Sequence, residues 1–197
     1  MSENKYRENK RRADSVAGNE ANFVTIQDMM ACRDRRSDIQ SRLLQEYGHP
    51  IISFCMNIPG PVKTNALIRR AFDEGCSEIR KAISEAGWPV SSPTEIHEKT
   101  GDELILSVDA AAADIKKRMS LIEETHPLGR LFDIDVLDTN GEKLSRPRYR
   151  TCFICSRQAQ DCARSRRHTA QELFESIMKM LNTYYQSVGL RKNRPDR

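Results

Sequence analysis

The sequence predicts a single α+β domain, or an α/β domain, in which helices pack on a mixed β-sheet. Short apolar runs of strand length alternate with longer stretches in which apolar side chains recur at helical spacing. The chain has 197 residues, of which 38% are apolar, and this is enough for one hydrophobic core. We therefore expect one domain over residues 23–188, after a disordered polar segment (1–22) and before a loose basic tail (189–197).

The first half of the domain predicts two helices separated by a strand. A helix over about 26–46 follows a capping threonine, and the apolar run at 50–58 is bounded by prolines, which predicts a buried strand. A second helix is expected over 64–87, with an interruption at Gly75 because glycine disfavours helix interiors. Residues 88–101 are rich in serine and proline, which indicates a loop.

The second half of the domain predicts three more strands and two more helices. The strands are expected over residues 103–110, 131–137 and 142–146. Helical spacing predicts one helix over 111–124. A capping box of Thr169 and Glu172 opens a last helix that ends near residue 188. This order of elements does not fix the order of the strands in the sheet.

The composition excludes several classes of protein. No stretch approaches the roughly 18 apolar residues that a membrane-spanning helix needs. The charged N-terminus lacks the apolar run of a secretory signal. Without such a signal, six cysteines predict reduced thiols or metal ligands rather than a disulfide framework. We therefore expect a cytoplasmic protein.

Positive charge is concentrated in one segment, residues 146–167. This segment holds seven arginines and a single acid, whereas the net charge of the whole chain is only +4. Arginine donates forked hydrogen bonds that suit phosphate and carboxylate groups. Arg164 and Arg166 are therefore candidates for binding a polyanionic substrate or an acidic partner protein, and a solvated basic face is the alternative.

Asp133 and Asp135 form the most informative motif. On a strand, residues i and i+2 point to the same side, so the two carboxylates are expected to share one face. Neighbouring carboxylates repel unless a cation lies between them, and Mg²⁺ binds carboxylates together with water and substrate phosphate. This arrangement suits phosphoryl or nucleotidyl transfer, and an acidic solvent face is the alternative. The preceding Gly129 and Arg130 favour the site, because glycine permits close backbone approach and arginine can hold a phosphate.

A second candidate for anion binding is the Pro-Gly-Pro-Val-Lys-Thr element at residues 59–64. Backbone N–H groups at the start of the following helix, together with Lys63, would bind an anion there. Arg69 and Arg70 follow within two turns. A rigid turn without a ligand is equally compatible with this sequence.

Cys152, Cys155, Cys162 and His168 follow the spacing C-x2-C-x6-C-x5-H. Three thiolates and one imidazole can complete a tetrahedral Zn²⁺ site. The alternative is a group of reduced thiols beside the last helix, since the spacing matches no common zinc motif well. The other three cysteines lie in apolar stretches and are expected to be buried.

Three separated motifs resemble the apo-citrate lyase phosphoribosyl-dephospho-CoA transferase family, also called citrate lyase holo-acyl-carrier-protein synthases. The motifs are PGPVKTNALIRRAFDEG (59–75), HPLGRLFDIDVLD (126–138) and RTCFICSRQAQDCARSRRH (150–168). The resemblance extends from about residue 23 to 186. It implies transfer of phosphoribosyl-dephospho-CoA from triphosphoribosyl-dephospho-CoA to a serine of the acyl carrier (gamma) subunit of citrate lyase, with release of pyrophosphate.

The implied reaction gives the candidate residues roles. Asp133 and Asp135 would hold Mg²⁺ on the reacting phosphates. Arg130, Lys63 and part of the arginine segment would neutralise the polyphosphate. His126 is a candidate base for the serine hydroxyl. Because acyl carrier proteins are usually acidic, the arginine segment is also a candidate docking surface.

Two other functions are compatible with parts of the sequence. A basic, zinc-dependent RNA-binding module would explain the arginines and cysteines, but it leaves Asp133 and Asp135 without a role and offers few aromatic residues for base stacking. Nucleic acid is therefore not the partner we expect. The second alternative is a carrier that binds the CoA-like cofactor without chemistry. A nucleotidyltransferase-like fold is a further hypothesis. That superfamily typically has a Gly-Ser pair about ten residues before its D-x-D motif, and this sequence has none at that distance.

Overall fold

The computed structural model describes residues 23–146, 149–155 and 157–192, so the expectation for residues 1–22 lies outside this part of the chain. At its centre is a four-stranded sheet with strand order β2-β3-β1-β4, in which every neighbouring pair is antiparallel. The strands are β1 (Ile51–Met56), β2 (Val90–Glu98), β3 (Gly101–Val108) and β4 (Phe132–Leu137).

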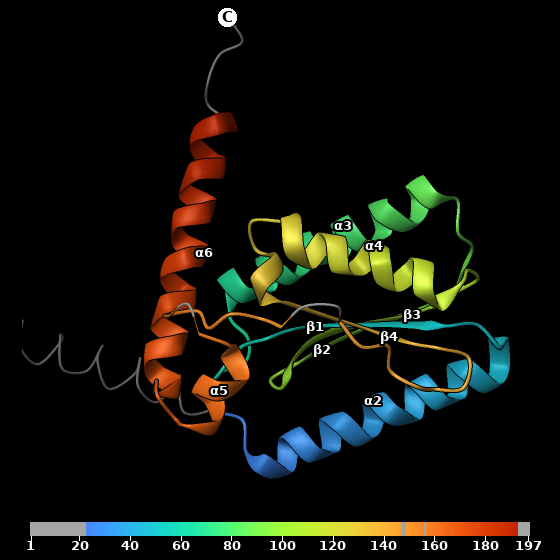
Figure 1. The fold of residues 1–197 in the computed structure, drawn as a ribbon, viewed down its shortest axis with the longest axis horizontal. Coiled ribbons are helices and arrows are strands. Elements are labelled where there is room, and N and C mark those ends of the chain that lie inside the picture. Colours follow the sequence, from blue (N-terminus) through green and yellow to red (C-terminus); the bar gives the residue numbers. More distant parts are fainter. Residues whose placement is uncertain (1–22, 147–148, 156, 193–197) are drawn as a thin grey trace, which may run out of the picture.

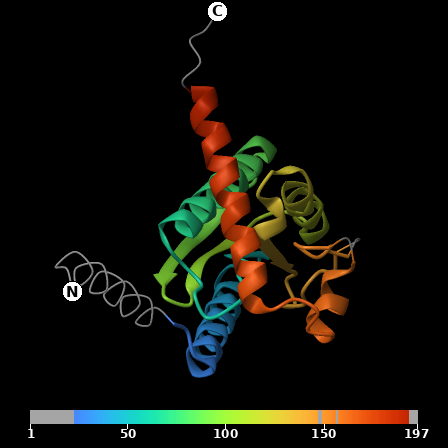
Figure 2. The same ribbon diagram turned by 90° about the vertical axis from the view of Figure 1, so that its left-hand side faces the viewer.

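Helices cover both faces of this sheet (Figure 1). On one face lie α3 (Ala66–Ala86) and α4 (Ala112–Thr125), and on the other lies α2 (Ile26–Tyr47). The long helix α6 (Ala170–Lys192) crosses one end of the sheet, and the short helix α5 (Ala159–Arg164) lies near its first turns (Figure 2). None of the described helices is long and apolar enough to cross a membrane.

The elements from β1 to β4 follow the order β-α-β-β-α-β. Each of the two helices connects strands that are parallel to each other but separated by a third strand, which is the split βαβ, or ferredoxin-like, arrangement. The α+β class predicted from the sequence is confirmed. The sheet is wholly antiparallel rather than mixed, because an oppositely directed strand lies between the two strands that each helix connects.

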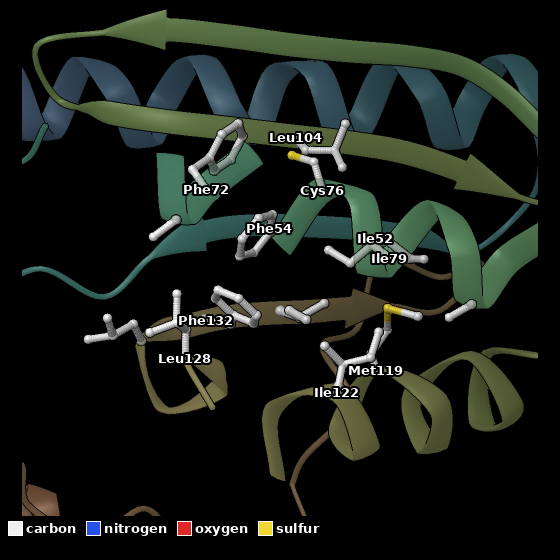
Figure 3. Packing of buried hydrophobic residues seen from close by; sticks show 14 of the residues in the cluster. Ile52, Phe54, Phe72, Cys76, Ile79, Leu104, Met119, Ile122, Leu128 and Phe132 are labelled. Atoms are coloured by element: carbon white, nitrogen blue, oxygen red, sulfur yellow. The ribbon is translucent and has the colours of Figure 1, made fainter. Parts of the chain in front are cut away.

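The main hydrophobic core lies between the sheet and the pair α3 and α4 (Figure 3). Alternate strand residues point into it and are at most 1% exposed: Ile52, Phe54, Leu104, Leu106, Phe132 and Ile134. The ring of Phe54 stacks on Phe72 of α3 at 5.1 Å and meets Phe132 edge-on at 5.5 Å, both between centroids. On the opposite face a smaller cluster packs against α2: Leu43, Ile51 and Ile105.

The predicted helix boundaries are largely confirmed. Thr25 and Asp28 form a capping box at the start of α2. Thr169 and Glu172 exchange the same pair of hydrogen bonds before α6. This helix continues to Lys192, so the prediction of a loose tail is wrong for residues 189–192, while residues 193–197 lie outside the described chain.

Residues 88–101 are not the predicted loop, because they contain β2. This strand lies at the edge of the sheet, and its pairing with β3 shifts register between Ser91 and Thr94. The shift accommodates Pro93, which has no N–H to donate to a regular ladder. An edge strand keeps many of its side chains half-exposed or exposed, which explains the polar composition that suggested a loop.

Two further expectations are also wrong. The strand expected over 142–146 is reduced to one bridge between Leu137 and Lys143. Helix α3 continues through Gly75 without interruption. A Cβ atom at Gly75 would lie only 2.5 Å from Cζ of Phe54, so the glycine lets α3 pack closely on the sheet.

Gly75→Ala should destabilise the protein, although alanine favours a helix more than glycine does. The added methyl group would overlap the ring of Phe54, and we expect a loss of about 1–3 kcal/mol in the free energy of unfolding, measured by denaturant titration. Gly189→Ala in α6 is the control, because a Cβ there meets nothing within 4 Å and should add up to about 1 kcal/mol. Equal stabilisation by both substitutions would contradict the close packing of α3.

Candidate functional site

Asp133 and Asp135 lie on β4 and share one face of the sheet, as the alternation of a strand predicts. Their neighbours Phe132 and Ile134 point into the core on the opposite face. Across the sheet, Asp133 is paired in register with Cys55 of β1. The two carboxylates therefore face the side of the sheet that α2 covers in part.

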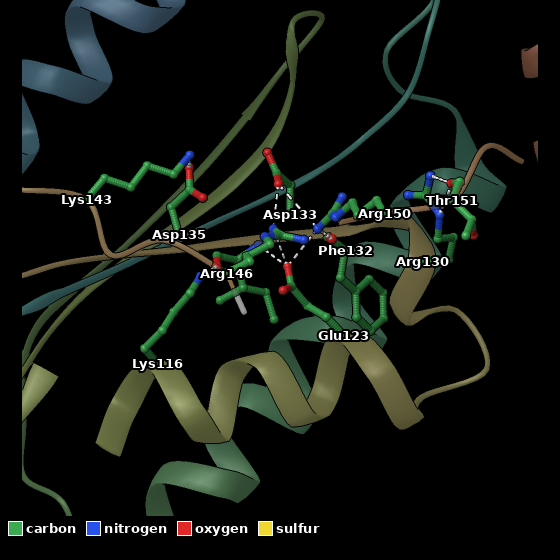
Figure 4. A network of polar contacts seen from close by, with 11 residues as sticks. Lys116, Glu123, Arg130, Phe132, Asp133, Asp135, Lys143, Arg146, Arg150 and Thr151 are labelled. Atoms are coloured by element: carbon green, nitrogen blue, oxygen red, sulfur yellow. Dashed lines mark hydrogen bonds and ion pairs between the residues drawn. The ribbon is translucent and has the colours of Figure 1, made fainter. Parts of the chain in front are cut away.

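Basic side chains from the segment after β4 neutralise these carboxylates (Figure 4). Nζ of Lys143 lies 2.5 Å from Oδ2 of Asp135. Asp133 Oδ1 lies 2.9 Å from Nη2 of Arg146 and 3.4 Å from Nη2 of Arg150. The cations that the paired acids require are thus supplied within the chain.

Glu123 of α4 completes this network, and sequence reasoning missed it. Its side chain is only 6% exposed, and one oxygen, Oε1, accepts hydrogen bonds from Arg146 at 2.6 Å and from Arg150 at 2.8 Å. The same oxygen accepts the backbone N–H of Ile134 at 2.8 Å. Burial raises the pKa of Glu123, and the hydrogen bond from Ile134 and the two arginines oppose this shift. A sequence motif could not have revealed Glu123, because its contacts with the two arginines form only when the segment after β4 folds against α4.

Three cavities adjoin this network. One of about 600 Å³ is lined by Asp133, Lys143, Arg146 and Arg150. A second, of about 210 Å³, is lined by three cations and three acids: Arg33, Arg36, Lys63, Asp102, Glu103 and Asp133. A third, of about 530 Å³, lies on the α4 side and is lined by Arg130, Arg146, Arg150 and His126. Asp133 therefore lines one mainly cationic cavity, which can accept a phosphate group, and one smaller cavity of mixed charge.

Arg130 lies on the α4 side of the network, and within the described part of the chain it forms no ion pair with Asp133. Its Nε donates to the backbone oxygen of Thr151 at 2.9 Å, and its guanidinium lies 4.2 Å from the ring centre of Phe153. Burial and the neighbouring Arg150 lower the pKa of Arg130 to about 10. Arg130 lines the third cavity together with Arg146 and Arg150 of the network.

His126 and Gly129 both have close packing partners. Nδ1 of His126 accepts the N–H of Leu128 at 3.1 Å, and Nε2 lies 3.3 Å from a carboxylate oxygen of Glu74. Both ring nitrogens are therefore engaged. A Cβ atom at Gly129 would lie 2.6 Å from two backbone oxygens of α4, so the glycine allows the turn into β4.

The predicted anion site at the start of α3 is only partly formed. The side chain of Asn65 accepts hydrogen bonds from the N–H groups of Leu67 and Ile68, so the helix N-terminus already has a cap. Lys63 donates to the backbone oxygen of Ile58 at 2.6 Å, and burial lowers the pKa of Lys63. Lys63 nevertheless lines the same cavity as Asp133.

The other predicted arginines lie apart from this network. Arg69 pairs with the buried Asp102 at 2.5 Å, and Arg70 lies over the ring of Tyr185 at 3.9 Å. Arg164 ends α5 and Arg166 follows it, and both are exposed. Neither is among the described residues that line the three cavities.

The four residues of the predicted metal motif are brought together. The thiol sulfurs of Cys152, Cys155 and Cys162 and a ring nitrogen of His168 all lie within 4.8 Å of one another. Of the other cysteines, Cys32 and Cys76 are buried as expected, whereas Cys55 is half-buried. The cluster could hold a metal ion such as zinc.

Comparison with known proteins decides the family. A family model described as apo-citrate lyase phosphoribosyl-dephospho-CoA transferase matches residues 24–184. The chain belongs to this family. Proteins of that name from Escherichia coli O139:H28 (strain E24377A / ETEC) and Shigella boydii serotype 18 (strain CDC 3083-94 / BS512) are each 36% identical over 163 residues, 81% of this chain and 89% of theirs. The predicted resemblance to this family is confirmed, and so is the prediction of an enzyme, a transferase of this family.

Glu123→Gln should destabilise this transferase by about 1–3 kcal/mol, because it leaves the partly buried Arg146 and Arg150 with one carboxylate instead of two. Thermal and denaturant unfolding measure the loss. Glu124→Gln is the matched control, since its exposed side chain should change stability by less than about 0.5 kcal/mol. A Glu123→Gln protein as stable as this control would show that the network does not hold β4.

Proposed function

We propose that the chain transfers phosphoribosyl-dephospho-CoA from triphosphoribosyl-dephospho-CoA to a serine of the acyl carrier (gamma) subunit of citrate lyase, and that it releases pyrophosphate. Membership of the transferase family carries this proposal. The cavity that Lys143, Arg146 and Arg150 line next to Asp133 supports it, because the donor is a polyphosphate. The serine oxygen forms the new bond to phosphorus, the bond to pyrophosphate breaks, and the serine proton is released.

The cations around Asp133 would bind the donor. Arg146 and Arg150 are held by carboxylates in the structure, so their guanidinium groups are already oriented toward a shared anion position. Lys63 faces the smaller cavity from the other side of Asp133. Phosphate oxygens entering these cavities would take over part of the hydrogen bonding that the carboxylates now provide.

The carboxylates of Asp133 and Asp135 fit a Mg²⁺ ion. Oδ1 of Asp135 is buried and has no hydrogen-bond partner among the described residues, so it is available as a ligand. Oxygen ligands on a shared strand face match the preference of this ion. Mg²⁺, when bound, neutralises charge on phosphate groups. Lys143 would then have to leave Asp135, and its side chain is 59% exposed and can move into solvent.

The exposed arginines at the end of α5 are proposed to dock the carrier subunit. Arg164, Arg166 and Arg167 do not line the cavities around Asp133, and all three are exposed within four residues at the end of α5. Acyl carrier proteins are usually acidic, so complementary charge would accelerate their association.

A transfer assay with the purified chain tests the proposed reaction. Incubation with the apo acyl carrier subunit, Mg²⁺ and triphosphoribosyl-dephospho-CoA should add the mass of phosphoribosyl-dephospho-CoA to one serine and release one pyrophosphate. Asp133→Asn and Asp135→Asn should each lower turnover by about 100-fold or more, because they remove charge that holds the metal.

Asp114→Asn is the control for these variants, since Asp114 is exposed on α4 and should keep normal turnover. Circular dichroism would confirm that all three proteins are folded. Tight binding of the donor without pyrophosphate release would show a carrier instead of an enzyme. Near-normal turnover of either site variant would contradict the metal assignment while leaving the reaction intact.

Replacing Arg164, Arg166 and Arg167 by Gln should raise the KM for the carrier subunit by about 10-fold at low salt and weaken its salt dependence, with kcat unchanged. Initial rates at two ionic strengths measure both constants. A control protein loses the same charge from other exposed positions: Arg42, Lys81 and Lys117. If both triple variants behave alike, the arginines at α5 act only through net charge and the docking surface lies elsewhere.

A further inference from the structure

The cluster of Cys152, Cys155, Cys162 and His168 has no part in the proposed transfer. It lies in the segment between β4 and α6. Arg130, which lines the cavity of about 530 Å³, also lines a cavity of about 240 Å³ together with Cys152, Cys162 and His168. Sγ of Cys155 lies 3.4 Å from Sγ of Cys162 and 3.3 Å from Nε2 of His168. Four soft or borderline ligand atoms thus converge on one point.

These separations match a tetrahedral zinc site. Zinc–sulfur bonds of about 2.3 Å and zinc–nitrogen bonds of about 2.0 Å place neighbouring ligand atoms of a regular tetrahedron roughly 3.5–3.8 Å apart. The observed spacings of 3.4 and 3.3 Å are close to these values, and the whole set spans no more than 4.8 Å. An ion at the centre requires these two pairs to separate by a few tenths of an ångström, and a pair at the 4.8 Å limit to close by about 1 Å.

The backbone around the cluster is arranged as in a metal-binding turn. The N–H of Ile154 points to Sγ of Cys152 at 3.5 Å, a contact that stabilises a thiolate. The N–H of Cys152 donates to the oxygen of Arg157 at 2.8 Å and closes the loop that contains Cys155. Thr151 forms an isolated bridge with Gln158 at the base of this loop.

Hydrophobic burial alone does not account for the order of this segment. Between Thr151 and His168, Cys162 is the one described residue that is buried, and the helix α5 has only six residues. A segment with so little apolar burial usually needs another source of stability, such as a metal. The cysteine that is buried is itself one of the four ligands.

We infer that Cys152, Cys155, Cys162 and His168 bind one Zn²⁺ ion in a closed structural site that fixes the arginine segment against β4 and α6. All four positions are filled by protein ligands, which leaves none for a substrate or water. Zn²⁺ is the ion that three thiolates and one imidazole in a tetrahedron select.

The position of this site gives it a specific structural consequence. The carbonyl of Thr151, next to the first cysteine, accepts a hydrogen bond from Arg130, and the N–H of Ala159 donates to the oxygen of Arg150 at 2.8 Å. His168 directly precedes the capping box of α6. The ion therefore ties two arginines of the cavity at α4 to the start of the last helix.

Metal analysis of the full chain, purified without chelator and then supplied with ZnCl2, tests this inference. We expect one zinc per chain in the wild type and its loss in Cys152→Ser and in Cys162→Ser. Cys76→Ala is the control, because it removes a buried cysteine outside the cluster and should keep the ion. Co²⁺ in place of zinc should give the intense visible absorption of a tetrahedral thiolate site.

Because a cysteine variant could fail to fold, the wild-type chain provides a second test. After removal of the metal by a chelator, trypsin should cleave after Arg157 and Arg164 at least about 10-fold faster, while cleavage after Arg42 stays unchanged and the helical signal is retained. Substoichiometric zinc in the resupplied wild type, zinc retained by both cysteine variants, or a cleavage pattern that ignores the chelator would each overturn the inference. A disulfide between Cys155 and Cys162 in the isolated chain would overturn it as well.

Discussion

The acid–base network around β4 is the interaction on which the proposed site depends. β4 ends the sheet, so one row of its backbone groups has no neighbouring strand. Side chains supply the partners instead: Glu123 accepts the N–H of Ile134, Lys116 donates to the oxygen of Ile134, and Arg150 donates to the oxygen of Phe132 (Figure 4). This protection favours the register of β4 with β1, and the register decides which face of the sheet Asp133 and Asp135 occupy.

The same cations serve stability and the proposed chemistry. Arg146 and Arg150 each contact a carboxylate on either side of β4, Glu123 toward α4 and Asp133 toward α2. A phosphate that replaces Asp133 as their partner is again an anion with forked oxygen acceptors, so the guanidinium groups lose little on the exchange. Glu123 would hold both arginines during that exchange, because it is more deeply buried than Asp133.

Features that depend on local periodicity could be predicted from the sequence. The alternation around Asp133 fixed the face of its carboxylate, and the cysteine and histidine spacing identified all four members of the cluster. Features that depend on distant partners could not be predicted. In the sequence, Glu123 cannot be distinguished from other acids on a helix surface, because the arginines that bind it come from a distant segment. Gly75 suggests a helix interruption, because its close contact with Phe54 is visible only in the folded chain. β2 was missed because an edge strand with a proline in its bulge carries loop-like residues.

The arginines between residues 146 and 167 do not all occupy the same kind of environment. In sequence they form one basic stretch, but the fold divides them by position. Arg146 and Arg150 have side chains about 20% exposed that contact carboxylates. Arg164 and Arg166 follow the three cysteines of the cluster in the sequence and are exposed. Along the chain, the cysteines lie between these two groups. In the proposed transfer, the inner arginines would bind the polyphosphate donor and the outer ones the acidic carrier protein, so the two substrates would contact separate parts of the same segment.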